Sequence, residues 1–307
     1  MFKDKVVLVT GGTGSFGKFF IKKILNDEPK KVIVFSRDEF KQSEMAKEFT
    51  LHDGMVHDGR IRYMLGDVRD LSRLKRMFSG VDYVIHAAAL KQVPALEYNP
   101  TEAVLTNVDG AKNVVEAAID CGVKKVVALS TDKAVNPVNL YGATKLCAEK
   151  IFTAANAYNK TKFSCVRYGN VIGSRGSVIP FFQKLKDDGC TVFPVTDINM
   201  TRFWLTLDQA VRLVLDTFIQ MDGGEIFVPR IPSMKVVDMA MAMGATEVEH
   251  IGIRPGEKMH EILVSEDCAN VYHIIGDEKV KANPGYTSDT NPYWMTPDEL
   301  RRILYAE

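Results

Sequence analysis

The stretch Val6-Val-Leu-Val-Thr10-Gly11-Gly-Thr-Gly14-Ser-Phe-Gly17 decides the fold of this chain. An apolar, β-branched run, closely spaced glycines and a helical pattern at 16–25 predict a strand, a tight turn and a helix. The glycines let backbone N–H groups approach a pyrophosphate, and the start of the helix favours negative charge. Such a turn can also be a plain strand–helix junction, but its place at the first strand favours a dinucleotide site. The residues expected to line this site are Gly11, Thr13, Gly14, Ser15, Phe16 and Gly17.

The same alternation of strand and helix continues through the first half of the chain. Further strands are expected at 32–36, 61–65, 83–87, 126–130 and 163–168. Further helices are expected at 39–50, 71–78, 101–121 and 140–158. Because the strands are almost continuously apolar, both faces of their sheet must be covered by helices. The fold class is therefore α/β, a doubly wound, Rossmann-like parallel sheet.

Beyond Tyr168 the alternation loosens, which indicates a second, smaller unit. A nucleotide-binding domain is expected at 1–172 plus 202–231, and a smaller, C-terminal substrate-binding domain at 173–201 plus 232–307. An amphipathic helix is expected at 206–221, and a capping box with proline in the first turn opens a final helix at Thr296. The segment 269–291 gives only weak signals and is expected to be partly mobile.

Composition excludes several kinds of partner and site. The 307 residues include 39 basic and 39 acidic side chains, so nothing indicates binding to nucleic acid or to an anionic membrane. Five scattered cysteines without a CxxC pair are typical of reduced thiols in the cytoplasm. No apolar run approaches the roughly 20 residues of a spanning helix, and the start of the chain is not a secretory signal. The histidines form no metal-binding pair, so no catalytic metal is expected.

The residues at the end of the second expected strand indicate which dinucleotide binds. An NAD site usually presents an acidic residue there, whereas the 2′-phosphate of NADP needs cations. Ser36 takes the acidic position, and Arg37 and Lys41 follow it, which favours NADP. NAD remains an alternative, because a small register shift would place the carboxylate of Asp38 at the acidic position. Arg37 and Asp38 can also be a solvated pair with no role in binding. After the next strand, Asp67 and Val68 are expected beside the adenine, although an aspartate in a turn is an equally good interpretation. After the strand that follows, Ala87, Ala88 and Ala89 are expected beside the ribose and nicotinamide, although packing of small residues explains them equally well.

Polar groups gather again after the fifth expected strand, in Ser130-Thr131-Asp132-Lys133 and Tyr141-Gly-Ala-Thr-Lys145. A tyrosine and a lysine four apart in a helix lie on one face, and the ammonium stabilises the phenolate as a base. Thr131 can hydrogen-bond a substrate oxygen. Asp132 and Lys133 add an acid and a base that a simple alcohol oxidation does not need. The alternative is that Thr131 and Asp132 only cap a helix and that Lys133 is solvated.

These motifs, with His86-Ala-Ala-Ala and Asn107, resemble the extended short-chain dehydrogenase/reductase superfamily. Within it, the chain is similar to the configuration-inverting UDP-N-acetylglucosamine 4,6-dehydratases that open pseudaminic acid biosynthesis. The resemblance spans about residues 3–264 and also rests on Phe35-Ser-Arg-Asp-Glu, Ala88-Ala-Leu-Lys91-Gln-Val-Pro, Arg167-Tyr-Gly-Asn-Val, Gly173-Ser-Arg-Gly-Ser-Val-Ile-Pro, Met200-Thr-Arg-Phe-Trp and Arg254-Pro-Gly-Glu-Lys. It implies NADP, a UDP-sugar substrate, bacterial glycan synthesis such as flagellin glycosylation, and a homo-oligomer that can be a hexamer.

The resemblance also implies a role for each catalytic residue. Tyr141 removes the proton of the sugar 4-hydroxyl, and Lys145 lowers the pKa of Tyr141 and binds the nicotinamide ribose. Asp132, kept protonated by burial, is the acid at the 6-hydroxyl, and Lys133, kept partly neutral by desolvation and nearby positive charge, is the base at C5. Retaining dehydratases carry glutamate at the position of Lys133, which favours inversion. The donor that returns a proton to C5 stays open between Tyr141, Lys133 and water.

The substrate needs cations for its diphosphate and acceptors for its ribose hydroxyls. Arg254 and Glu257 supply both, although Pro-Gly between them is also an ordinary turn signal. Lys91, which is also a cofactor candidate, can equally be a surface lysine. The other substrate candidates are Thr131, Asn170, Arg175, Ser177, Thr201 and Arg202, while Phe203 and Trp204 are expected in the core.

Two other functions stay open on the sequence. A retaining dehydratase or a C4 epimerase of a UDP-sugar would use the same fold. A non-catalytic NADP-sensing protein is a remote alternative, because such a protein would be expected to lose the Tyr141–Lys145 pair, which is intact here.

Overall fold

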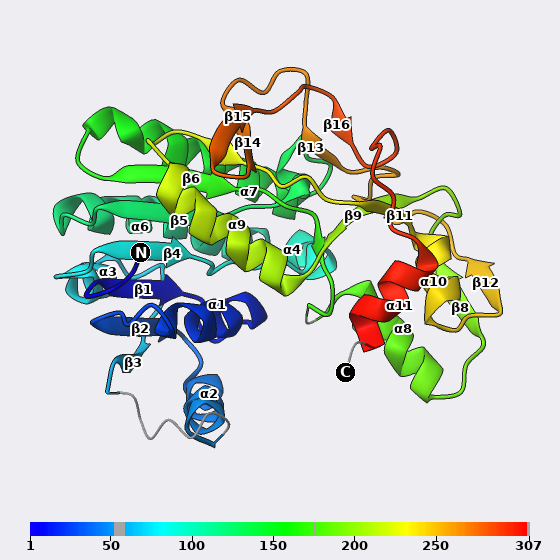
Figure 1. Cartoon of the computed structure of the whole chain (residues 1–307), viewed down its shortest axis with the longest axis horizontal. Helices are drawn as coiled ribbons and strands as arrows, with labels where there is room; N and C mark the ends of the chain where they lie inside the picture. Colours follow the sequence, from blue (N-terminus) through cyan, green and yellow to red (C-terminus); the bar gives the residue numbers. More distant parts are fainter. Residues whose placement is uncertain (52–58, 175, 306–307) are drawn as a thin grey trace.

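The computed structural model describes residues 1–51, 59–174 and 176–305, so the predicted substrate residue Arg175 lies outside the described residues. In this described part, a nine-stranded sheet forms the body of the molecule in the order β15-β14-β10-β6-β5-β4-β1-β2-β3 (Figure 1). Neighbouring strands are parallel except β14 and β15, which are antiparallel. The strands are β1 (Val6–Thr10), β2 (Lys31–Ser36), β3 (Ile61–Leu65), β4 (Tyr83–His86), β5 (Lys125–Leu129), β6 (Lys162–Val166), β10 (Ile226–Phe227), β14 (Val271–Ile275) and β15 (Glu278–Lys281).

Alternate residues of the central strands pack into two separate hydrophobic cores. Leu8 and Val126 face one layer of helices, whereas Val7 and Val127 face the other, and all four are fully buried. The first layer contains α3 (Leu71–Phe78), α6 (Gly110–Asp120) and α7 (Leu140–Ala154), and the second contains α1 (Ser15–Leu25), α2 (Glu39–Leu51) and α9 (Leu207–Gln220). With no polar face left on the strands, the sheet must be covered on both sides. The predicted doubly wound sheet is confirmed.

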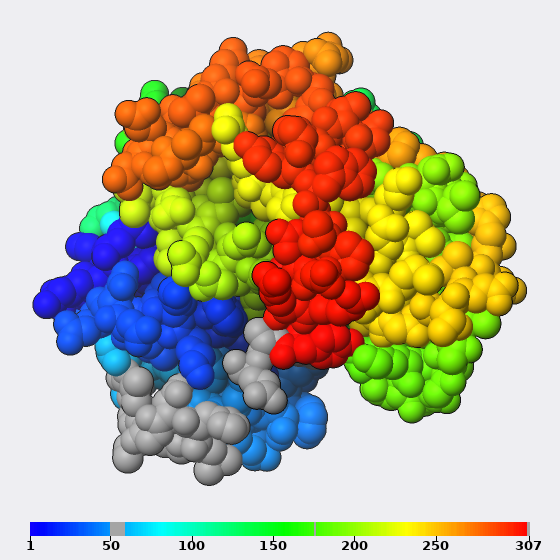
Figure 2. Space-filling view, turned by 45° about the vertical axis from the view of Figure 1, so that its right-hand side comes forward, coloured from blue at the N-terminus to red at the C-terminus, as the bar shows by residue number. Residues whose placement is uncertain are grey.

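A smaller unit with its own core lies at one end of the sheet. Trp204, Phe182, Phe193 and Met239 are fully or almost fully buried in this core. Its elements are α8 (Val178–Asp187), β8 (Val192–Val195), α10 (Val236–Met243), β12 (Glu247–His250) and α11 (Pro297–Tyr305). Figure 2 shows the C-terminal residues, in red, running down beside the yellow surface that contains α10.

Two short sheets connect the smaller unit to the large one. Three strands pair in the order β11-β9-β7, and two others form the antiparallel pair β13–β16. Their bounds are β7 (Asn170–Val171), β9 (Thr201–Leu205), β11 (Ser233–Lys235), β13 (Ile262–Val264) and β16 (Tyr286–Thr287). They stand over the same edge of the large sheet as the loops that follow its parallel strands (Figure 1).

The C-terminal part of the chain differs from the expected division. Residues 232–307 were expected to belong to the smaller domain, but β14 and β15 extend the large sheet beyond β10. This hairpin falls in the stretch that was expected to be partly mobile. Its strands are short, and β14 joins the sheet only through β10 and Val228, which lie far away in the sequence, so local sequence gave a weak signal.

The expected helix at 101–121 is interrupted. It consists of α5 (Pro100–Ala103), a π-helical segment η1 (Val104–Asp109) and α6. Inside the π-helical segment, the side chain of Asn107 accepts from Leu90 N at 2.9 Å and donates to Leu90 O at 2.9 Å. Wider turns of this kind often occur at functional sites. The neighbouring helix α4 (Val93–Tyr98) was not expected, and 3₁₀ turns form η2 (Asp132–Ala134) and η3 (Ala155–Tyr158).

Among the described residues, none of the helices has the length and apolar character needed to cross a lipid bilayer.

Candidate active site

The predicted site residues meet at the carboxyl ends of the parallel strands. The strand order reverses between β1 and β4, and ligands bind at such a switch point in open α/β sheets. Thr10, the last residue of β1, joins the two sides. Its hydroxyl is 2.9 Å from Nδ1 of His86 and accepts from Ala88 N at 3.2 Å. Ala87, Ala88 and Ala89 therefore lie directly beside the glycine loop.

The glycine loop has the shape that a pyrophosphate requires. Gly11 has φ +65°, and a Cβ there would lie 2.8 Å from Ala88 N, so a side chain would not fit. Helix α1 begins at Ser15 with Gly14 as its N-cap, and no described side chain caps it and no acidic residue lies in its first turn. The N–H groups of that turn are thus left for an external anion. Thr13 is buried in the loop, and Phe16 stacks on Phe20 with ring centroids 5.8 Å apart.

Cations lie at the end of β2, where a dinucleotide would place its adenosine. Ser36 is buried and its hydroxyl accepts from Gln42 Nε2 at 3.0 Å. Arg37, half exposed, is 3.7 Å from Asp67, and Lys41 is 2.9 Å from Asp38. Asp38 also accepts from the backbone N–H of Lys41, so its carboxylate is held at the start of α2. Both predicted cations are exposed enough to exchange these carboxylates for a phosphate.

The carboxylate at the end of β3 is held by cations. Burial alone would raise the pKa of Asp67, but hydrogen bonds from Arg69 outweigh burial and lower it. Val68, the next residue, is buried against Gly110 at the start of α6. The predicted adenine-flanking pair thus consists of an ionised carboxylate and a packed apolar residue.

The segment after β5 brings an acid into the interior. Thr131 caps η2 by accepting from Lys133 N at 3.3 Å, and its hydroxyl donates to Asp132 Oδ1 at 2.9 Å. Asp132 is fully buried, and its Oδ2 has no hydrogen-bond partner among the described residues. A buried, unpaired carboxyl oxygen is costly and is expected only where a ligand or proton completes it. Burial raises the pKa of Asp132, since it outweighs the nearby Lys133.

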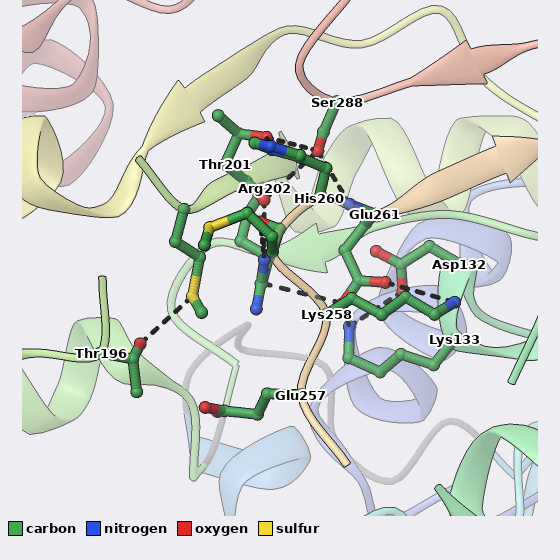
Figure 3. A network of polar contacts seen from close by, with 12 residues as sticks. Asp132, Lys133, Thr196, Thr201, Arg202, Glu257, Lys258, His260, Glu261 and Ser288 are labelled. Atoms are coloured by element: carbon green, nitrogen blue, oxygen red, sulfur yellow. Dashed lines mark hydrogen bonds and ion pairs between the residues drawn. The ribbon is translucent and has the colours of Figure 1, made fainter. Parts of the chain in front are cut away.

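Lys133 lies between two carboxylates. Its Nζ is 3.0 Å from Asp132 Oδ1 and 3.1 Å from Glu261 Oε1 (Figure 3). Burial favours the neutral amine, but the two carboxylates together raise the pKa of Lys133. The prediction that Lys133 is partly neutral is therefore wrong for this structure: burial and Arg202 lower its pKa as expected but are outweighed. Both members of the Asp132–Lys133 pair therefore have raised pKa values.

Tyr141 and Lys145 lie on α7, as predicted, but their electrostatic roles differ from the expectation. Lys145 is buried and donates from Nζ to Leu129 O at 2.6 Å. Burial raises the pKa of Tyr141 to about 12, against Lys133 and a hydrogen bond with Thr131, which lower it. The described cation that stabilises a Tyr141 phenolate is therefore Lys133 rather than Lys145. Burial also lowers the pKa of Lys145.

The start of α7 is fixed against both the catalytic segment and the loop at 254–257. A Cβ on Gly142 would lie 2.1 Å from Lys133 O, so only glycine allows this contact. Asn139 caps α7 by accepting from Gly142 N at 2.7 Å, and it donates to Gly256 O at 2.7 Å. Lys258 donates to Val135 O. These contacts hold the Arg254–Glu257 turn beside the Asp132–Lys133 pair.

The substrate candidates are distributed around this centre. Asn170 begins β7, and its buried Oδ1 has no partner among the described residues. Thr201 and Arg202 open β9, where Thr201 bonds to Nδ1 of His260 at 2.8 Å and Arg202 lies 3.7 Å from Glu261. In the outer loop, Glu257 points away from Lys133 and Glu261 (Figure 3).

Other candidates are more remote from the buried cluster. Arg254 is exposed, and its backbone N–H donates to Glu257 at 3.3 Å. Ser177 directly precedes α8, but its hydroxyl donates to Ser174 O at 2.7 Å and does not cap the helix. Lys91 is exposed in the loop between β4 and α4. The structure thus brings Thr131, Asp132, Lys133 and Tyr141 together and leaves these three side chains outside the cluster.

Sequence reasoning missed Glu261, the central carboxylate of the cluster. It is 2% exposed, lies 3.7 Å from Arg202 and 4.0 Å from Lys258, and its backbone N–H donates to Ser288. The only signal was an acidic residue directly before the apolar strand β13. Asn139 was also missed, although a polar residue before the Leu140 helix start is a recognisable cap.

The reversed strand order, the glycine loop and the Tyr141–Lys145 pair beside buried Thr131 together define an extended short-chain dehydrogenase/reductase fold. A family model described as "Polysaccharide biosynthesis protein" matches residues 7–277, and the chain belongs to this family.

Two names recur among the similar proteins. A Campylobacter jejuni protein named UDP-N-acetylglucosamine 4,6-dehydratase (inverting) is 50% identical over an alignment of 336 residues that covers 99% of this chain and 98% of that protein. A Rickettsia canadensis protein named UDP-glucose 4-epimerase is 39% identical, covering 99% and 96%.

Two solved structures match over nearly the full length. The X-ray structure of Pen from Bacillus thuringiensis has a TM-score of 0.88 and 39% identity, covering 100% of this chain and 99% of that one. DesIV, a dTDP-glucose 4,6-dehydratase from Streptomyces venezuelae solved with NAD and TYD, has a TM-score of 0.75 and 23% identity, covering 97% and 95%. The DesIV comparison bears on the fold alone.

Proposed function

We propose that the protein catalyses the NADP-dependent 4,6-dehydration of UDP-N-acetylglucosamine with inversion at C5. The product is UDP-2-acetamido-2,6-dideoxy-β-L-arabino-hex-4-ulose. The observation that carries this proposal is the Asp132–Lys133 pair, 3.0 Å apart, with Asp132 fully buried, beside Tyr141. A plain reductase has no use for this second acid and base, and the C. jejuni relative of that name supports the assignment.

The residues at the dinucleotide cleft fit a nicotinamide cofactor, because the uncapped start of α1 and the exposed cations after β2 match its phosphates. Bound there, the nicotinamide would accept the C4 hydride of the sugar and later return it to C6. Thr131 and Tyr141 would hold the 4-hydroxyl, and Tyr141 would take its proton. The ammonium of Lys133 lowers the cost of the resulting phenolate.

Asp132 and Lys133 would then remove water from the 4-keto sugar. Transfer of one proton from the Lys133 ammonium to Asp132 yields an amine and a carboxylic acid, the forms required of a base and an acid. The C5–H bond breaks and its proton passes to Nζ of Lys133. The C6–O bond breaks as Asp132 protonates the departing oxygen, and water leaves. The pair holds one proton before this step and one proton after it.

The choice of NADP rests on the end of β2. Ser36 carries no charge, and Arg37 and Lys41 are exposed cations that a 2′-phosphate could engage. The proposed contacts to UDP are Arg254 with the diphosphate and Glu257 with the ribose diol. Asn170, whose Oδ1 lacks a partner in the described structure, is proposed to bind the sugar or the diphosphate.

The test is to incubate the protein with UDP-N-acetylglucosamine and NADP in heavy water and to assign the product by NMR. A 6-deoxy-4-keto sugar with an inverted, deuterated C5 is expected. Retention at C5 would indicate a retaining dehydratase instead.

A C4 epimerase is the second candidate, because Rickettsia relatives at 39% and 42% identity carry the name UDP-glucose 4-epimerase. An epimerase needs Tyr141 and Lys145 but not an acid at O6. The same incubation distinguishes the two functions. A C4 epimer that keeps its 6-hydroxyl and carries no deuterium at C5 would overturn the dehydratase proposal.

The resemblance supports further proposals on the setting of this reaction. We propose that the protein is a homo-oligomer such as a hexamer and that it acts in the cytoplasm. We also propose that its reaction is the first step toward pseudaminic acid for flagellin glycosylation. Size-exclusion chromatography with light scattering tests the first, and glycan analysis of a deletion strain tests the last.

A further inference from the structure

Glu261 is a buried carboxylate to which the proposed reaction assigns no step. It lies directly before β13, is 2% exposed, and faces charged groups from several elements that pack on it. These groups are Lys133 and Asp132 of η2, Arg202 of β9, Lys258 of the preceding loop, and, farther along the same hydrogen-bond network, His260 through Thr201 and Ser288 (Figure 3). Tyr141 of α7 adjoins Lys133 and Asp132.

The two carboxyl groups of this cluster have opposite protonation preferences. Burial alone would raise the pKa of Glu261, but Lys133, Arg202 and Lys258 together lower it, so Glu261 stays ionised. The pKa of Asp132 moves upward, chiefly through burial and partly through the charge of Glu261. Glu261 is thus the fixed negative charge, and Asp132 is the group able to accept a proton.

The position of Glu261 allows it to act on both members of the proton-sharing pair. Its Oε1 is 3.1 Å from Lys133 Nζ, and Nζ in turn is 3.0 Å from Asp132 Oδ1. A fixed negative charge at this range makes the loss of a proton harder from either Asp132 or Lys133. Its other oxygen, Oε2, has no hydrogen-bond partner among the described residues, so the carboxylate acts through charge more than through a filled set of bonds.

We propose that Glu261 is a positioning residue that keeps one proton on the Asp132–Lys133 pair, an inference that rests on the proposed dehydration. The working state of the pair is singly protonated. A second proton, added at low pH, leaves no base, and loss of the only proton at high pH leaves no acid. The pH profile of kcat/KM should therefore be bell-shaped, with an acidic and an alkaline limb. The negative charge of Glu261 moves both limbs to higher pH.

The experiment compares pH profiles of kcat/KM for dehydration, read by the deuterated C5 product, in the wild-type protein and in Glu261→Gln. The variant keeps the size of the side chain and removes its charge. Both limbs are expected to move to lower pH by about one to three units, the usual effect of a nearby charge. Glu261→Asp keeps the charge and should keep the limbs close to wild type at a reduced rate.

Glu225 provides a matched control. It is also a buried carboxylate paired with a lysine, Lys279 at 2.8 Å, but it lies at the amino end of β10, away from the site. Glu225→Gln should lower stability and leave the limbs in place, so a general loss of a buried ion pair is separated from the proposed effect.

Arg202→Gln supplies a second, independent readout if Glu261→Gln does not fold. Arg202 opposes the effect of Glu261 on Lys133, so its removal should move the limbs to higher pH. Wild-type limbs in a folded Glu261→Gln, or in Arg202→Gln, would overturn the role of Glu261. A wild-type protein that forms no deuterated product would instead overturn the dehydratase assignment itself.

Discussion

The side-chain amide of Asn139 donates to the carbonyl of Gly256 at 2.7 Å, while its oxygen accepts from the N–H of Gly142 at the same distance. One residue thereby caps the helix that carries Tyr141 and Lys145 and holds the turn of Arg254 and Glu257. In the proposed enzyme, the nucleotide end of the substrate and the reacting sugar are positioned through this side chain.

Asn139→Asp separates these two roles. Aspartate is an equally good helix cap, so the midpoint of thermal unfolding should change little. It cannot donate to Gly256, so KM for the UDP-sugar should rise up to about tenfold, equivalent to about 1.4 kcal/mol for a lost hydrogen bond. Steady-state kinetics measure this change. Asn139→Ala, which loses both bonds, should lower the unfolding midpoint as well; unchanged KM in both variants would contradict the coupling.

Lys133→Ala removes the proposed base at C5. Deuterium exchange at C5 should be abolished, while NADP binding by fluorescence titration should persist, because Lys133 faces Asp132 and Glu261 rather than the glycine loop. Lys150→Ala, on the exposed face of α7, is the control and should keep full exchange. Normal turnover in the Lys133 variant would remove this residue from the mechanism.

Arg37→Ala tests the choice of cofactor. Loss of the exposed guanidinium should weaken NADP at least tenfold more than NAD, because a charge-assisted bond to phosphate contributes about 1.5–3 kcal/mol. Isothermal titration with both dinucleotides gives the ratio. Asp38→Ala is the matched variant at the alternative position, and a selective loss of NAD binding there, with equal losses in the arginine variant, would favour NAD.

His86 makes the stability of the fold depend on pH. It is 2% exposed, and burial lowers its pKa to about 3, against an ordinary value of 6.5. Below about pH 6.5 the unfolded chain binds a proton that the folded chain refuses, so stability should fall with pH toward 3. The slope approaches about 1.4 kcal/mol per pH unit.

Urea unfolding at pH 7, 6, 5 and 4 measures this slope. His86→Gln should flatten it, whereas His250→Gln, at a side chain that is 57% exposed, should not. Equal slopes in wild type and His86→Gln would assign the acid sensitivity to other groups.

The parallel sheet was predictable because its signals are local. The strand Ile61–Leu65 and the helix Leu71–Phe78 have the predicted bounds, since an apolar run and a helical period each occupy adjacent residues. The proximity of Asp132, Lys133 and Tyr141 was predictable for the same reason, as they share one strand end and the following helix. The roles assigned to these residues stay predictions.

The rest depends on contacts between distant segments. Glu261 reaches Lys133 only because β13 pairs with β16 and lies beside η2. The wide turn at η1 depends on the bonds of Asn107 to Leu90 on another loop. The raised pKa of Lys133 follows from Asp132, its neighbour in the sequence, together with Glu261, which no nearby sequence motif contains.

The return of the chain to β14 and β15 means that segments of the smaller unit alternate with strands of the large sheet along the sequence. The polypeptide leaves the sheet after β6 to build α8 and β8, and it returns for β10. It leaves again for α10 and β12, and it comes back with β14 and β15 to complete the sheet edge before it ends in α11. During synthesis, the outer border of the sheet must therefore wait for residues near 281 to leave the ribosome. Truncation before that point would expose β10 as a bare edge, and no single cut could release the two parts as intact, separate modules.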